Sequence, residues 1–154
     1  MISKSKIRAS IIIVISTSVL YLSNVFFMIN PMMSSTLNVY GKPIEVCCNN
    51  PVTGYYRDGK CITGADDFGT HIVCAQVTDE FLKFSKAQGN DLIAPRPEYN
   101  FPGLIKGNCW CLCISRWQDA ERNNVAPLIN LNATHQKALE YVDLATLEKY
   151  AIIH

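Results

Sequence analysis

The sequence lacks the short motifs that mark several common classes of enzyme and metalloprotein. It contains no G-x-S-x-G, no Walker A loop and no G-x-G-x-x-G, so the local signatures of an α/β-hydrolase, a P-loop protein and a dinucleotide-binding fold are missing. It also contains no C-x-x-C, which excludes the two-knuckle form of a zinc finger. Internal repeats and low-complexity tracts are absent as well. The sequence therefore points to no named reaction through a short motif.

Charge is also scarce. Only 18% of the 154 residues are charged and the formal net charge is +1, so no large basic field is available to attract nucleic acid. Hydrophobic residues make up 49% of the chain, which excludes a disordered, collagen-like or coiled-coil protein. This length suits one domain with a core of its own. The one compositional excess is cysteine, with seven residues.

We predict that residues 1–33 are separate from the rest of the chain. The basic residues Lys4, Lys6 and Arg8 precede an uncharged, mostly apolar stretch at residues 11–29. As a helix this stretch would span roughly 28 Å, which is close to the thickness of the hydrocarbon core of a membrane. Because the basic residues lie on its N-terminal side, the positive-inside rule predicts a single-pass membrane protein with its N-terminus in the cytoplasm.

Two alternatives to a membrane anchor stay open. The apolar stretch is also compatible with a cleaved signal peptide, although no A-x-A-like site follows it. Alternatively, translation starts at Met32 or Met33, in which case the stretch is not translated and the protein is cytoplasmic. In every case residues 34–154 are expected to form a single globular domain.

The pattern of the remaining residues predicts a small α+β domain. We expect a mixed sheet, three to four short helices packed mainly on one of its faces, and two long loops at residues 48–70 and 89–108. Loops of that length in a compact domain are usually functional. The expected strands are residues 71–77, 109–114 and 128–131, and the second is expected to be central because it is apolar on both faces. The expected helix N-caps are Thr78, Ser115, Thr134 and Asp143.

The cysteines of residues 109–114 alternate along a predicted strand, so Cys109, Cys111 and Cys113 point to one face. Cα atoms two residues apart in a strand are about 6.5–7 Å apart, at the outer limit for a disulfide, so we expect no bridge within the strand. Three roles are open for the thiols: apolar packing, a metal or redox site, and structural disulfides. Any partner would come from distant segments. The obvious partners are Cys47, Cys61 and Cys74.

Two histidines and three arginines are further candidates. His71 begins a predicted strand at the end of a long loop, and His135 lies in the first turn of a predicted helix, where the neutral imidazole is favoured. Arg96 lies between two prolines, and a stiff segment holds a forked donor well. Together with Arg57 and Arg116 it is a candidate for binding an anion. Asp66 and Asp67 are interpreted as turn residues.

The sequence contains four distinctive motifs: P-x-T-G-x-x-R-D-G-x-C-x-T-G at 51–64, G-x-H-x-V-C-A at 69–75, W-C-L-C at 110–113 and A-T-H at 133–135. Together they resemble an uncharacterised, mainly bacterial family known as domain of unknown function 2237. The resemblance runs from about residue 38 to residue 150 and implies a shared fold, but the family has no established activity. It implies that Cys48 and Cys109 depart from the family pattern, and so does Asn50, where an acidic residue is more usual. It also implies that relatives begin near Met33.

The sequence supports three hypotheses of function. In the first, the pattern cysteines and histidines bind a zinc-like ion or act as a thiol redox module. In the second, the domain is an enzyme with a site between the two long loops, in which Cys61 or Cys111 is the nucleophile beside a histidine. In the third, the loops bind a peptide or a small anion. The candidate metal ligands are Cys47, Cys61, Cys74, Cys111, Cys113, His71 and His135.

Overall fold

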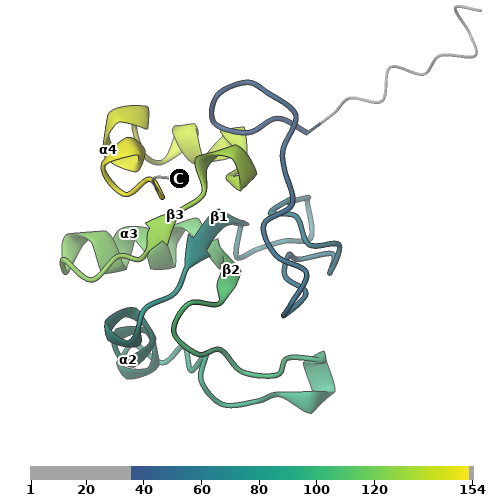
Figure 1. Ribbon diagram of the computed structural model, residues 1–154, viewed down its shortest axis with the longest axis vertical. Helices are drawn as coiled ribbons and strands as arrows, with labels where there is room; N and C mark the ends of the chain where they lie inside the picture. Colours follow the sequence, from purple (N-terminus) through teal and green to yellow (C-terminus); the bar gives the residue numbers. More distant parts are fainter. Residues whose placement is uncertain (1–35, 153–154) are drawn as a thin grey trace, which may run out of the picture. The chain divides into compact units, whose positions relative to one another are not determined.

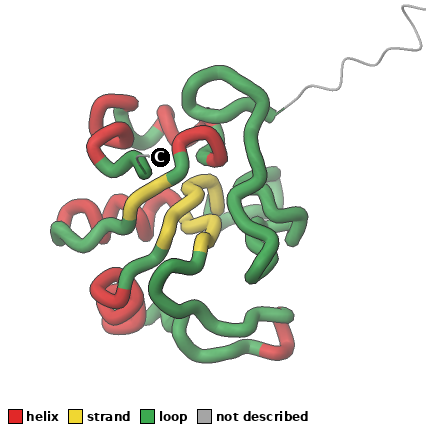
Figure 2. Tube along the Cα trace, viewed as in Figure 1, coloured by secondary structure: helices red, strands yellow, loops and turns green. Residues whose placement is uncertain are grey.

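The computed structural model describes residues 36–152, which form a small α+β domain. Three short strands lie side by side in the order β2-β1-β3, with bounds Cys109–Cys113, His71–Gln76 and Leu128–Ile129 (Figure 1). The α-helices are α2 (Asp79–Ala87), α3 (Ile114–Arg122) and α4 (Leu144–Lys149). Three 3-10 turns complete the elements: η1 (Pro97–Tyr99), η2 (Leu131–Ala133) and η3 (Gln136–Glu140). Figure 2 shows how much of the rest of the domain is loop.

The sheet is antiparallel, not mixed as the sequence suggested. β1 pairs antiparallel with both β2 and β3. Beyond the strand ends, the N–H of Val77 donates to the carbonyl of Asn108, and the N–H of Gly107 donates to the carbonyl of Val77. β1 and β2 are therefore the arms of a β-hairpin, and α2 with the loop at 89–108 is a long insertion between them. A β-α-β order in the sequence does not distinguish this insertion from a crossover.

The prediction that residues 109–114 form the central strand was wrong. β1 is central, and β2 lies at the edge of the sheet. The loop at 48–70 covers this edge: the hydroxyl of Thr53 accepts the N–H of Cys111 at 2.7 Å, and both residues are buried. The apolar residues of β2 are buried although the strand lies at the edge, because this loop, and not a further strand, shields them from water.

Two of the predicted helix caps are confirmed and two are not. The hydroxyl of Thr78 accepts the N–H of Phe81, and the carboxylate of Asp143 accepts the N–H of Thr146. The N-cap of α3 is Cys113 and not Ser115, because the helix follows β2 without a connecting loop. The N-cap of η3 is His135 and not Thr134.

The main core lies between the sheet and the helices. α3 packs against β1, β2 and α2, and both Trp117 of α3 and Phe81 of α2 are buried in this core. Within residues 36–152, no helix is long and apolar enough to cross a membrane. The predicted anchor at residues 11–29 lies outside the described residues, so the membrane topology and the localisation stay predictions.

Candidate functional site

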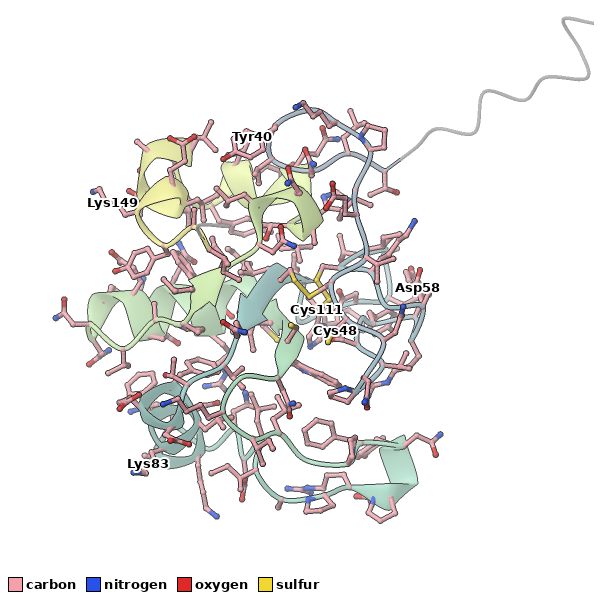
Figure 3. All side chains as sticks on the ribbon, in the orientation of Figure 1. Tyr40, Cys48, Asp58, Lys83, Cys111 and Lys149 are labelled. Atoms are coloured by element: carbon pink, nitrogen blue, oxygen red, sulfur yellow. A yellow bond between two sulfur atoms is a disulfide. The ribbon has the colours of Figure 1, made fainter. Side chains whose placement is uncertain are left out.

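Four cysteines that are distant in the sequence meet between β1, β2 and the first long loop. Cys47 is bonded to Cys74, with Cα atoms 5.6 Å apart, and Cys61 is bonded to Cys111, with Cα atoms 5.3 Å apart. These spacings lie within the usual range for a disulfide. Figure 3 shows both sulfur–sulfur bonds close to the labelled Cys111. We call these four residues the disulfide cluster.

The sequence left open three roles for these sulfurs, and the structure has the disulfide form. The sulfurs of Cys47, Cys61 and Cys74 lie within 4.8 Å of one another, so the predicted convergence of distant cysteines is found. Among the described residues, no histidine nitrogen is near enough to join that group. In the enzyme hypothesis, Cys61 or Cys111 is the nucleophile. Both are buried and bonded, so neither offers a free thiol.

A second group of polar side chains lies at the start of β1 and the end of β2. The ring Nδ1 of His71 is 2.6 Å from a carboxylate oxygen of Asp67. The other carboxylate oxygen of Asp67 accepts the backbone N–H of His71 at 2.8 Å and the hydroxyl of Thr63 at 2.9 Å. Cys113 pairs with His71 across the two strands, and both side chains line the same small hollow. Since Asp67 occupies Nδ1, Nε2 is the nitrogen left for a sulfur or a substrate.

A β-bulge brings His71 opposite Cys113. Val73 pairs with Leu112, so regular pairing would place Ile72 opposite Cys113, but the register shifts and His71 takes that place. Bulges re-aim side chains in this way, often beside active sites. The bulge follows Thr70, a β-branched residue with a φ of 51°. Such a residue rarely adopts this conformation, so the turn before His71 is strained.

Two backbone bonds and one glycine hold the strained turn in place. The carbonyl of Thr70 accepts the N–H groups of both Ile72 and Ile114, which ties the start of β1 to the start of α3. Next to it, a Cβ atom on Gly69 would lie 2.5 Å from the His71 ring and 3.0 Å from the Cys113 sulfur. Only glycine therefore fits at residue 69 while the imidazole and the thiol stay together.

The electrostatics of this group favour a protonated imidazole. The hydrogen bond to Cys113 raises the pKa of His71 to about 9, although burial opposes this, and the carboxylate of Asp67 adds to the rise. Burial alone would raise the pKa of Asp67, but the hydrogen bonds from His71 and Thr63 lower it overall. Asp67 is thus an ionised, buried carboxylate that orients a cationic ring.

Cys113 also occupies the N-cap of α3, a nine-residue helix. The first turn of a helix has backbone N–H groups without partners inside the helix, and its dipole favours negative charge nearby. A helix N-terminus and a neighbouring imidazolium are two of the environments that activate a cysteine thiolate. Cys113 is a free cysteine with intermediate exposure, and it lines the smallest hollow beside the strand.

A groove leads away from this thiol along Trp110. Three adjoining hollows of about 50, 250 and 290 Å³ share Trp110 in their linings. The smallest contains Cys113 and Arg116, and the two larger ones share Arg57 and Tyr99. We call this feature the arginine groove. Its other lining residues include Gly54, Tyr55, His71, Asn90, Leu92, Arg96 and Phe101.

The three predicted anion-binding arginines all line this groove. The guanidinium of Arg57 lies 5.0 Å from the centre of the Trp110 ring and donates to the carbonyl of Tyr99 at 3.4 Å. The guanidinium of Arg116 donates to the carbonyl of Gln88 at 3.2 Å. Arg96 lies in the second long loop. Residues of both long loops line the two larger hollows.

The remaining candidates lie elsewhere. The Nδ1 of His135 accepts the N–H of Lys137, and burial, followed by the charge of Lys137, lowers the pKa of His135. His135 is therefore a capping residue in this structure. The thiols of Cys48 and Cys109 interact with each other, and burial followed by this contact raises the pKa of Cys109 to about 11.

The family resemblance is confirmed. A family model described as an uncharacterised protein conserved in bacteria, DUF2237, matches residues 37–151. The chain belongs to this family. A comparison with curated proteins finds no match. The family match supports the shared fold and assigns no reaction, so the argument for function depends on the geometry of the site.

Sequence reasoning missed Asp67 and the pairing of His71 with Cys113. Asp67 was interpreted as a turn residue, and its backbone does form a turn, since its carbonyl accepts the N–H of Thr70. The available signal was an aspartate four residues before a histidine. The bulge that places Cys113 opposite His71 leaves no mark in the sequence.

Proposed function

We propose that this domain is a cysteine-dependent enzyme of the acyl-transfer class, with Cys113 as the nucleophile. The observation that carries the proposal is the hydrogen bond between Asp67 and His71 together with the placement of Cys113 opposite His71 in one hollow. A nucleophile, a base and a group that orients the base, in hydrogen-bonding sequence, form the arrangement that nucleophilic catalysis requires. The proposal keeps the predicted Cys/His site between the long loops and replaces Cys61 or Cys111 with Cys113.

The chemistry follows from these three side chains. The thiolate of Cys113 attacks a carbonyl carbon and forms a thioester, while His71 gives its proton to the leaving group. In the second step His71 takes a proton from water, the water oxygen attacks the thioester, and the Cys113 sulfur leaves as thiolate. Asp67 keeps the ring oriented and stabilises its positive charge throughout. The strained turn and the bulge support this proposal because such features cluster at active sites.

The test uses p-nitrophenyl acetate as a model acyl donor. We expect a burst of about one p-nitrophenolate per chain, with an acetyl group on Cys113 in the intact mass. Cys113→Ala should abolish the burst, and His71→Asn should slow it by about 10²- to 10⁴-fold, the usual contribution of general acid–base catalysis. Cys109→Ala is the matched control, since it also removes a free thiol from β2. Acetylation spread over all free thiols, unchanged in His71→Asn, would contradict the proposal.

A second candidate function concerns the disulfide cluster. Three of its sulfurs, those of Cys47, Cys61 and Cys74, lie within 4.8 Å of one another, so once reduced these three thiolates have the donor chemistry and spacing for a zinc-like ion. This requires that both disulfides are reduced first. Elemental analysis of protein purified with reductant and without oxygen tests it. About one zinc per chain, lost in Cys61→Ala, supports metal binding, whereas metal-free protein contradicts it.

A further inference from the structure

We infer that the arginine groove selects an anionic substrate, one that carries a carboxylate or phosphate group close to its electrophilic carbon. This inference rests on the proposed function, because the groove is a substrate site only if Cys113 is the nucleophile. It adds the charge and the binding residues of the substrate, which the thiol centre alone does not specify.

The three arginines of the groove lack acidic partners within the described chain. Among residues 36–152, the acidic partners in ion pairs are Asp67 with His71, Asp91 with Lys86, and Asp119 with an arginine on the outer side of α3. Asp91 lines the groove, but its carboxylate binds Lys86 and two backbone N–H groups. None of the three groove arginines has a carboxylate within ion-pair distance in the described chain.

Contacts with the backbone and with Trp110 hold Arg57 and Arg116 in place. A fully solvated surface arginine makes no specific contact, but Arg57 packs over Trp110 and reaches the carbonyl of Tyr99. Its backbone has a φ of 56°, so the residue adopts a left-handed conformation that directs the chain at this point. Arg116 is anchored to the carbonyl of Gln88. A guanidinium with further N–H donors free after one carbonyl contact is suited to bind a carboxylate or phosphate.

The arginines lie at different places relative to Cys113. Arg116 shares the smallest hollow with Cys113 and His71, so it lies close to where an electrophilic carbon would react. Arg57 and Arg96 line the largest of the three hollows, which shares Trp110 with the smallest one. The anionic group next to the electrophilic carbon would contact Arg116, and a further anionic group on a longer substrate would contact Arg57 and Arg96.

The first test compares two alkylating agents of nearly equal size, neutral iodoacetamide and anionic iodoacetate. We expect the iodoacetate-to-iodoacetamide rate ratio at Cys113 to exceed the ratio for N-acetylcysteine by at least about 10-fold, the order that one charge-assisted contact provides. Arg116→Gln should bring the ratio back to that reference with little change in the iodoacetamide rate. Arg122→Gln is the matched control, because Arg122 is on the same helix but pairs with Asp119. A ratio equal to that of N-acetylcysteine would overturn the inference.

The second test does not depend on thiol reactivity. In Cys113→Ala, inorganic phosphate is titrated while tryptophan fluorescence is recorded, since Trp110 lies directly under Arg57. We expect saturable quenching that Arg57→Gln weakens at least about 10-fold and that Arg122→Gln leaves unchanged. If phosphate quenches the fluorescence but Cys113 is alkylated slowly in the first test, the proposed enzyme is overturned and the anion site is kept. A fast Cys113 without charge preference, together with no phosphate response, would overturn the anion site alone.

Discussion

Removal of the Cys61–Cys111 disulfide should destabilise the domain strongly. This bond closes a loop of 50 residues, and the loss of chain entropy that such a cross-link imposes on the unfolded state corresponds to about 4 kcal/mol. The Cys47–Cys74 bond spans 27 residues, which gives about 3.5 kcal/mol by the same relation. For a domain of this size, a loss of about 4 kcal/mol lowers the melting temperature by roughly 16 °C. The perturbation is the double variant Cys61→Ala with Cys111→Ala, which leaves no unpaired thiol in the cluster.

The assay is urea unfolding without reductant, followed by circular dichroism and by tryptophan fluorescence. The matched control is Cys48→Ala with Cys109→Ala, which also removes two sulfurs but no cross-link and should cost about 1 kcal/mol. Wild-type protein with its disulfides reduced separates the cross-link from the packing of the side chains. Equal losses of stability in the two double variants would refute the stabilising role of the Cys61–Cys111 cross-link. It is also refuted if unfolded, unreduced wild-type protein titrates as seven free thiols and not three.

Three further predictions concern the thiol centre and its surroundings. Gly69→Ala should slow alkylation of Cys113 at least about 10-fold and lower the stability by less than about 1.5 kcal/mol. The reason is that the added Cβ would displace the side chains of His71 and Cys113 and no backbone atom. Equal alkylation rates in the two proteins would contradict the close packing of Gly69 against these side chains. The raised pKa of His71 stabilises the fold fully below pH 6.5, and this contribution is lost as the pH rises through 9. In urea unfolding, the difference in stability between wild type and His71→Gln should therefore narrow over that range. A difference that widens with pH would contradict the raised pKa. Mild oxidation should join Cys48 to Cys109 before either residue forms a disulfide with Cys113, as peptide mapping would show. A Cys109–Cys113 disulfide would contradict the expected spacing along the strand.

Local chemistry was predictable from the sequence. Thr78 and Asp143 are short polar residues placed before apolar helical patterns, so their capping role follows from side-chain chemistry alone. The strand from His71 and the strand from Cys109 follow from β-rich runs between turn residues. The convergence of distant cysteines on one place was also predicted, although the partners were not.

Long-range pairing was not predictable in this way. The direction of β2 depends on a hairpin with a helix and a loop inserted between its arms, and no local pattern encodes that return. The choice among thiols depends on which sulfur a bulge leaves beside His71. Asp67 acts both as a turn residue and as the partner of a histidine, and the sequence showed only the first role. Each of these features is fixed by tertiary contacts.

The alkylation of Cys113 by iodoacetamide as a function of pH, in wild type and in His71→Asn, tests the central claim most directly. The thiolate is the reactive form, and a cationic imidazole beside the sulfur favours it. The account predicts that at pH 6 to 7 wild-type Cys113 reacts at least about 10-fold faster than Cys48 or Cys109, and that His71→Asn removes this advantage. If Cys113 reacts no faster than the other two free thiols, or equally fast in both proteins, the proposed catalytic centre does not exist.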